Sequence, residues 1–143
     1  MDKIRTIIVE TLDGKEVDIL DRCAGKPLLL LFYNNTCMGC TGRALPMAYD
    51  YNMRHAHIDV VGIHVNFKNQ DISKADIINI FTSKKLPFPI FLDKTRIVYK
   101  QFSCDGVPHW ILLDENGHVL NSIFGSQEAA QNRLMYALEE LME

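Results

Sequence analysis

The sequence predicts an α/β protein in which helices flank a central mixed β-sheet. A continuous apolar run from Pro27 to Tyr33 is typical of a strand that is covered on both faces. Similar apolar runs alternate with amphipathic helical patterns along the rest of the chain, as they do in a sheet with helices on both sides. The chain of 143 residues fits one domain, residues 1–143, made of an N-terminal hairpin and connection (1–25) and a core (26–143).

Strands are expected where short apolar or alternating runs are bounded by turn residues. Two pairs of strands form hairpins, one around the turn signal Asp13-Gly14 and one around the turn from Glu115 to His118. Residues 21–26 connect the first hairpin to the core. The expected strands are 4–11, 15–20, 27–33, 58–66, 88–92, 109–114 and 119–124.

Helices are expected where apolar residues recur at helical spacing. The first helix follows the strand 27–33 and continues through 47–55, and Gly42 and Pro46 weaken its first turns. In the second helix, Ser73 is the expected N-cap, and Asp76 stands in the capping-box position. The remaining helical ranges are 73–85, 96–102 and 127–142.

The composition is that of an ordinary soluble globular protein, with 48% hydrophobic and 23% charged residues and a net charge of −3. The sequence contains no basic stripe, so it gives no indication of a nucleic-acid partner. The longest apolar run, Pro27 to Tyr33, is too short to span a bilayer, and residues 1–5 lack the apolar middle region of a secretory signal. We therefore expect a cytoplasmic protein as the sequence stands, or a periplasmic or other extracytoplasmic one if an N-terminal leader has been removed.

Two cysteines carry the chemistry that we expect of this chain. Cys37 and Cys40 form a C-x-x-C motif directly after a buried strand and at the start of a helix. The unpaired N–H groups and the positive dipole end of a helix N-terminus favour a thiolate, so Cys37 is the expected nucleophile. Cys40 lies one turn further on and would resolve a mixed disulfide. Between them, Met38 is expected to offer apolar surface to a partner chain, and Gly39 keeps the loop narrow.

Other interpretations of the motif stay open. A C-x-x-C motif is also found as half of a zinc site, or as two inert core cysteines. A second ligand pair of the usual kind is absent, and His55 and His57 are two residues apart, which is poor spacing for joint ligation. We expect no bound metal, and a copper or zinc carrier that uses Cys37, Cys40 and a histidine is kept as an alternative.

A second motif lies far from the first one along the chain. Val107 and Pro108 precede the late strand 109–114, which leads into an Asp-x-x-Gly turn. Together with the strand, C-x-x-C and helix unit, this pattern resembles the thioredoxin superfamily over roughly residues 26–143. The resemblance implies a thioredoxin-like fold and a cis peptide bond before Pro108, which faces the cysteines. It also implies that the backbone of Val107 binds an extended substrate by strand addition.

The spacing of the two motifs indicates a branch of this superfamily. The gap between Cys40 and Pro108 is longer than in a minimal thioredoxin and holds an inserted helix before the expected cis proline. With the segment 86–93, this resembles the TlpA-like branch. Members of that branch are commonly membrane-tethered or exported and often reduce specific thiols outside the cytoplasm. The same domain also occurs in peroxide-reducing relatives.

The chain departs from the family pattern at four places. Thr36 stands where the family usually has a tryptophan in its substrate-docking surface, and Met38-Gly39 replaces a pair that often contains proline. Pro46 falls one residue later than usual, which predicts a bulge or a shifted register in the helix. Leu31 occupies the position of the buried carboxylate that some relatives keep beneath the second cysteine, and the alternative position near Phe67 is also apolar.

Without that carboxylate, deprotonation of Cys40 needs another route. Water, His109 and Asp105 are the candidates, and a positively charged His109 would also favour the thiolate of Cys37. His64 is expected to be a buried histidine with satisfied hydrogen bonds, and Cys104 is expected to be a packed small hydrophobe.

These expectations lead to a thiol–disulfide oxidoreductase that reduces or exchanges disulfides of proteins or small molecules. It would depend on an external electron-donating reductase, because no nucleotide or flavin motif is present and no cofactor is expected. The alternative enzyme is a thiol peroxidase, in which peroxide oxidises Cys37 and Cys40 resolves the sulfenic acid. Asn34 stands where the usual peroxidase motif has a threonine, three residues before the reactive cysteine.

Overall fold

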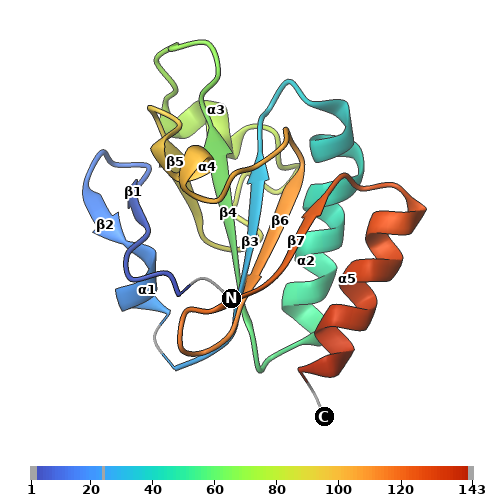
Figure 1. Cartoon of the computed structure of the whole chain (residues 1–143). Coiled ribbons are helices and arrows are strands. Elements are labelled where there is room, and N and C mark those ends of the chain that lie inside the picture. Colours follow the sequence, from blue (N-terminus) through green and yellow to red (C-terminus); the bar gives the residue numbers. More distant parts are fainter. Residues whose placement is uncertain (1–2, 24, 142–143) are drawn as a thin grey trace.

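The computed structural model of the chain describes residues 3–23 and 25–141 (Figure 1). Its strands are β1 (Ile8–Glu10), β2 (Glu16–Asp18), β3 (Leu28–Tyr33), β4 (Asp59–Val65), β5 (Ile90–Asp93), β6 (His109–Leu113) and β7 (Val119–Phe124). Its helices are α1 (Ile19–Arg22), α2 (Leu45–Arg54), α3 (Lys74–Ile78), α4 (Ile97–Gln101) and α5 (Glu128–Glu140), and a π-helical turn, η1 (Cys40–Ala44), precedes α2.

Within the described residues, seven strands form one mixed sheet in the order β2-β1-β5-β4-β3-β6-β7. The central strands β3, β4 and β5 run parallel, whereas β6 and β7 at one edge and β1 and β2 at the other edge pair antiparallel with their neighbours. The predicted fold class is therefore confirmed, and both predicted hairpins are present.

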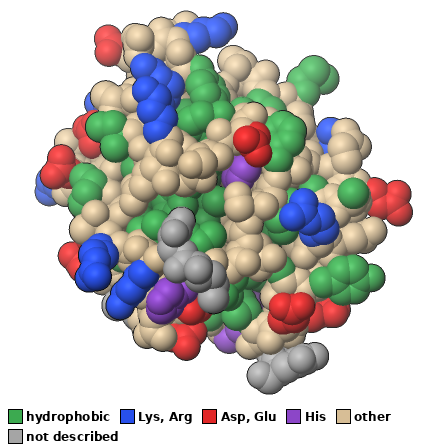
Figure 2. All heavy atoms as spheres, in the orientation of Figure 1, with side chains coloured by type: hydrophobic (Ala, Val, Ile, Leu, Met, Phe, Trp, Pro, Cys, Tyr) green, Lys and Arg blue, Asp and Glu red, His purple; other side chains and the backbone are tan. Residues whose placement is uncertain are grey.

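Helices cover both faces of this sheet (Figure 1). All six residues of β3 are buried, and their side chains alternate between two apolar cores. The core beneath α2, α3 and α5 contains Leu31, Cys40 and Trp110. The core beneath α1 and α4 contains Phe32 and Ile111. The first of these two faces therefore holds the buried cysteine of the motif. Acidic and basic side chains are interspersed on the surface outside these cores, as Figure 2 shows for one side of the molecule.

The inserted helix is shorter than the predicted range 73–85. The capping box is confirmed, because the Ser73 hydroxyl accepts from the Asp76 amide and the Asp76 carboxylate accepts from the Ser73 amide. The helix α3 nevertheless ends at Ile78, and the chain continues in tight turns to Lys84, whose φ is 59°. The polar residues that follow Ile78 compete for backbone hydrogen bonds and favour turns, which explains the early end.

Two other predicted boundaries need correction. The range 4–11 contributes only the short strand β1, and residues expected in the second strand and the connection form the helical turn α1. Asp18 caps this turn, because its carboxylate accepts from the amides of Ile7 and Leu20. The last helix is observed as Glu128–Glu140, and its predicted end at Met142 lies outside the described residues.

The predicted shift of helical register before Pro46 is confirmed. In η1 the amide of Leu45 donates to the carbonyl of Cys40, five residues back, so the turn holds one residue more than an α-helical turn. Pro46 then lies in the first turn of α2, directly after the π-helical turn. Among the described helices, none combines the length and the apolar character needed to cross a membrane.

Gly106 precedes the segment Val107-Pro108 and has a φ of 147°, which few residues other than glycine adopt. A Cβ atom there would lie 2.9 Å from Cε1 of Phe124. We expect Gly106→Ala to lower the free energy of unfolding by roughly 1–3 kcal/mol in urea denaturation. Gly42→Ala is the matched control, since a Cβ atom there meets nothing within 4 Å, and it should leave stability unchanged or raised. Equal losses in both variants would contradict this account.

Candidate active site

The loop between β3 and the first helical turn is fixed by side-chain hydrogen bonds. The Asn34 amide group donates to the Val65 carbonyl at 2.8 Å, and its Oδ1 accepts from the Thr36 amide at 2.9 Å. The Asn35 backbone N–H donates to Nε2 of His64 at 3.4 Å. These bonds tie the loop to the carboxyl end of β4, so the loop presents the next residue, Cys37, at a defined place beside the sheet.

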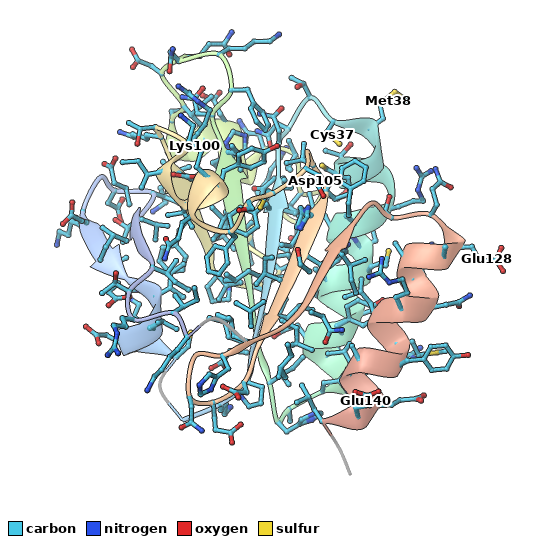
Figure 3. The ribbon with its side chains drawn as sticks, in the orientation of Figure 1. Cys37, Met38, Lys100, Asp105, Glu128 and Glu140 are labelled. Atoms are coloured by element: carbon cyan, nitrogen blue, oxygen red, sulfur yellow. The ribbon has the colours of Figure 1, made fainter. Side chains whose placement is uncertain are left out.

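Cys37 lies where the backbone amides of the first helical turn converge. The Cys40 N–H donates to Sγ of Cys37 at 3.2 Å, which is the contact that a helix N-terminus offers to a thiolate. On its other side, Sγ of Cys37 lies 3.6 Å from the carbonyl oxygen of Val107. The Cys37 side chain is half-buried and therefore accessible at the end of the sheet (Figure 3).

Cys40 lies deeper, with no exposed surface. Burial raises the pKa of the Cys40 thiol well above its ordinary value, and the hydrogen bond from this thiol to the Cys37 sulfur acts in the same direction. A hydrogen bond from the backbone of Asn34 acts the other way. All four cysteines are free thiols, so this is the dithiol state of the pair, with a proton held on the inner sulfur.

Val107 and Pro108 lie opposite the motif. The Val107–Pro108 peptide bond is cis, as the resemblance implied. Pro108 is buried, and its Cδ lies 3.7 Å from the point that a Cβ atom on Gly39 would occupy. The structure thus brings together Cys37, Cys40, Gly39, Val107 and Pro108, from two segments that are far apart in the sequence.

Thr36 and Met38 flank Cys37 on the outside. Met38 is 86% exposed, and Figure 3 shows its side chain pointing away from the body of the molecule. Thr36 is also exposed, but its hydroxyl donates to Oδ1 of Asn34 and is therefore occupied within the loop. Of the two, Met38 offers free apolar surface next to the outer thiol.

The structure turns the side chain of His109 away from Cys40. His109 pairs with Phe32 in the sheet and lies on the face opposite Cys40, because side chains alternate along β6. Its Nδ1 accepts from the Asp105 amide at 3.3 Å, so Nε2 carries the proton and donates to the Ser122 hydroxyl at 2.8 Å. Burial lowers the pKa of His109, which opposes the positive charge considered for it.

Asp105 is exposed, and the charged and titratable groups near its carboxylate are His109, Cys104 and Tyr99.

Two buried polar groups lie side by side on β3 and β4. The Tyr33 hydroxyl and Nδ1 of His64 have no hydrogen-bond partner among the described residues, and their rings pack edge to face at 5.3 Å. Burial, together with the nearby Cys40, raises the pKa of Tyr33. Of the two ring nitrogens of His64, Nε2 accepts a hydrogen bond from the Asn35 amide. The sequences of the two strands do not show that Tyr33 and His64 lie side by side. This contact follows from the register between β3 and β4, in which the two residues are paired.

The other two thiols belong to the opposite core. Cys104 and Cys23 are half-buried and pack against the cluster beneath α1 and α4. Burial raises the pKa of Cys104 to about 12 and that of Cys23 to about 11. The packing of Cys104 agrees with its expected role as a small hydrophobe of the core. In the described part of the chain, no group of three or more His, Cys, Asp or Glu side chains is arranged to hold a metal ion.

A cysteine pair at a helix N-terminus, opposite a cis proline on a mixed sheet, is the arrangement of thioredoxin-like oxidoreductases. A model of the AhpC/TSA family matches residues 1–122. The chain belongs to the AhpC/TSA family, and its resemblance to the TlpA-like branch of the thioredoxin superfamily is confirmed.

Several known proteins are similar to this chain. Sporulation thiol-disulfide oxidoreductase A of Bacillus subtilis (strain 168) is 25% identical over 124 residues, which cover 87% of this chain and 73% of that protein. Thiol-disulfide oxidoreductase ResA of Bacillus anthracis is 25% identical over 124 residues, which cover 87% and 69%. The solved structure of the exposed lipoprotein thioredoxin Etrx1 of Streptococcus pneumoniae (strain TIGR4) has a TM-score of 0.74 at 19% identity, and the match covers 95% of this chain and 99% of that one. The thioredoxin-like fold is thereby confirmed.

His64 is expected to make the free energy of unfolding of the protein sensitive to acid. Burial lowers its pKa from 6.5 to about 4, so the unfolded chain takes up a proton before the folded one does as the pH falls. We therefore expect the free energy of unfolding to fall between pH 7 and pH 4, with His64 accounting for roughly 2 kcal/mol of the loss. Urea denaturation under dithiothreitol at several pH values measures this dependence.

The variant His64→Gln isolates the contribution of His64 from those of other titrating groups. Its free energy of unfolding should change less over the same pH range, whatever its stability at pH 7. Parallel pH profiles for the wild type and the variant would contradict the assignment.

Proposed function

We propose that the chain is a thiol–disulfide oxidoreductase that reduces or exchanges protein disulfides through Cys37 and Cys40. The observation that carries the proposal is the hydrogen bond from the Cys40 amide to Sγ of Cys37, with the thiol of Cys40 buried directly behind it. One sulfur is accessible and accepts a hydrogen bond from a backbone amide of the first helical turn, and the other is protected until the first has reacted. The names of the relatives from Bacillus subtilis and Bacillus anthracis support the same chemistry.

In the first step, the Cys37 thiolate attacks one sulfur of the substrate disulfide. A new bond forms between the Cys37 sulfur and that sulfur, the substrate S–S bond breaks, and the second substrate sulfur leaves as a thiolate that takes up a proton. We assign Val107 and Pro108 to substrate binding, because the Val107 carbonyl lies beside Sγ of Cys37 at 3.6 Å. Met38 supplies apolar contact surface, and Thr36 and Gly39 shape the rim of the site.

In the second step, the Cys40 sulfur attacks Cys37 and releases the remaining substrate thiol. Once Cys37 is part of a mixed disulfide, its sulfur is a weaker acceptor for the hydrogen bond from the Cys40 thiol. Cys40 then loses this proton to water and bonds to the Cys37 sulfur, while the bond between Cys37 and the substrate breaks and the substrate sulfur leaves as a thiolate that takes up a proton. Two electrons and two protons have passed to the substrate, and an external dithiol reductase restores the starting state.

Peroxide reduction is the second candidate, because the family model that matches the chain is that of AhpC/TSA proteins. Asn34 weakens this candidate. It stands where the peroxidase motif has a threonine, and both ends of its side chain are engaged, by the Val65 carbonyl and by Thr36. A metal carrier would need a third ligand beside the two cysteines, and the described residues provide no such group.

The names of the relatives, rather than features of the chain itself, support an extracytoplasmic compartment. One structural relative is named an exposed lipoprotein, which favours the extracytoplasmic alternative for this chain as well. A disulfide reductase working there would receive its electrons from another dithiol protein. We propose such a protein as the partner that reduces the Cys37–Cys40 disulfide.

Insulin reduction with dithiothreitol tests the proposed activity. We expect the wild type to accelerate it, and we expect Cys37→Ser to lose this acceleration completely because the attacking sulfur is gone. Cys104→Ser is the matched control and should retain most of the activity, because Cys104 packs in the opposite core. Hydrogen peroxide consumption with the same reductant should be slow. Insulin reduction that survives Cys37→Ser, or rapid peroxide consumption without insulin reduction, would contradict the proposal.

A further inference from the structure

Arg43 lies within the π-helical turn that follows Cys40, close to the cysteine pair. One of its terminal nitrogens lies 3.6 Å from the point that a Cβ atom on Gly39 would occupy. Gly39 separates the two cysteines, so a guanidinium group sits against the motif itself. The extra residue in η1 sets the position of Arg43 relative to this motif.

The guanidinium is held there by a buried hydroxyl. Nε of Arg43 donates to the Ser126 hydroxyl at 3.2 Å, and this hydroxyl donates to the Gly39 carbonyl at 3.3 Å. Ser126 is only 3% exposed. A surface arginine normally samples many rotamers, whereas this one is joined to the motif through a chain of two hydrogen bonds.

The segment that carries Ser126 is itself fixed to the sheet. The indole N–H of Trp110 donates to the Gly125 carbonyl at 2.9 Å, and the Gly125 amide donates to the Pro108 carbonyl at 2.8 Å. Trp110 is fully buried. Hydrogen bonds to the core therefore fix the position of Ser126, and the hydrogen bond between Ser126 and Arg43 fixes the position of the guanidinium group.

The charge of Arg43 is not balanced within the described residues, because none of their carboxylates lies within 4.0 Å of its nitrogens. Glu128 follows Ser126 closely in sequence, and Figure 3 shows its side chain pointing outward from the start of α5. Arg43 is exposed, so its terminal N–H groups are open to a ligand. They form a local cationic site on a protein whose net charge is −3.

We propose that Arg43 forms a subsite for a carboxylate that lies near the disulfide of the substrate. The proposal rests on the proposed function and adds a substrate class, namely acidic disulfides. The carboxylate would accept hydrogen bonds from the terminal nitrogens of Arg43 while the substrate disulfide approaches Cys37. Arg43 binds and orients the substrate in this account, and the bond exchange at sulfur is carried out by the two cysteines.

Rates with disulfides of different charge test the subsite. The pre-reduced protein is mixed with dianionic dithiobis(nitrobenzoate), neutral dithiodipyridine or dicationic cystamine at low ionic strength. We expect Arg43→Gln to slow the reaction with the dianion roughly two- to fivefold and to leave the neutral disulfide within error of the wild type. Arg43→Glu should slow the dianion further and accelerate the dication. Added salt should remove these differences.

Arg54→Gln is the matched control. It removes the same charge from the far end of α2, roughly 16 Å along the helix from Arg43, and should leave the order of the three rates unchanged. An equal loss of rate with all three disulfides in Arg43→Gln would overturn the subsite, because it would show a general effect on Cys37 or on folding. Unchanged rates with all three would overturn it as well. Wild-type protein that reduced none of them would contradict the proposed function.

Two sources of the carboxylate are distinguished by two further substrates. Glutathione disulfide represents low-molecular-weight thiols, and a pair of peptide disulfides that carry Glu or Gln beside the cysteine represents proteins. Arg43→Gln should slow glutathione disulfide if the subsite serves small thiols. It should abolish a preference for the Glu peptide if the subsite serves proteins. A loss on neither substrate would contradict a carboxylate subsite.

Discussion

The hydrogen bond from the Cys40 amide to the Cys37 sulfur requires the chain to leave a buried strand and begin a helix within a few residues. That transition depends on the loop residues Asn34 and Asn35, whose hydrogen bonds to Val65 and His64 fix the loop to β4. It also depends on the burial of Cys40, which places the inner thiol in the core beneath α2. If the loop moved, the amide would no longer point at the sulfur, and the difference between the two thiols would fade.

The helix that follows the cysteine motif is irregular at its start. Pro46 lies six residues after Cys40, and the π-helical turn η1 accommodates one residue more than an α-helical turn between them. The turn exposes Arg43 at the rim, and Ser126 holds it against Gly39. A departure in helical register has thus placed a fixed cation next to the reactive pair. This connects a local feature of the backbone with the kind of substrate that the site would accept.

Much of the fold could be predicted from the sequence, because its central strands are apolar and bounded by turn residues. The predicted range of β3 is correct to within one residue, because Pro27 before it and Asn34-Asn35 after it limit the length of its apolar run. The helix α3 was predicted too long, because apolar spacing continues beyond Ile78 while the polar residues there favour turns. The sequence does not predict the turn α1, because Asp18 stands in an alternating pattern that is typical of a strand, whereas in the structure it caps a helical turn.

The candidate site also contains residues that local motifs predict and contacts that they do not. Cys37, Cys40 and the cis peptide bond before Pro108 belong to local motifs, and the structure brings them together. The contact between Arg43 and Ser126 joins residues 83 positions apart, so no local pattern reveals it. His109 was considered as a neighbour of the thiols because it follows Pro108 in sequence. The alternation of side chains along β6 turns it to the other face of the sheet.

The central claim is that Cys37 attacks the substrate disulfide and that Cys40 resolves the mixed disulfide that results. Trapping tests it most directly. Cys40→Ser protein is incubated with a disulfide-bonded peptide, and the product is digested and mapped by mass spectrometry. The account predicts one stable peptide adduct on Cys37, which the wild type resolves. Adducts located on Cys23 or Cys104, or no adduct at all, would contradict it.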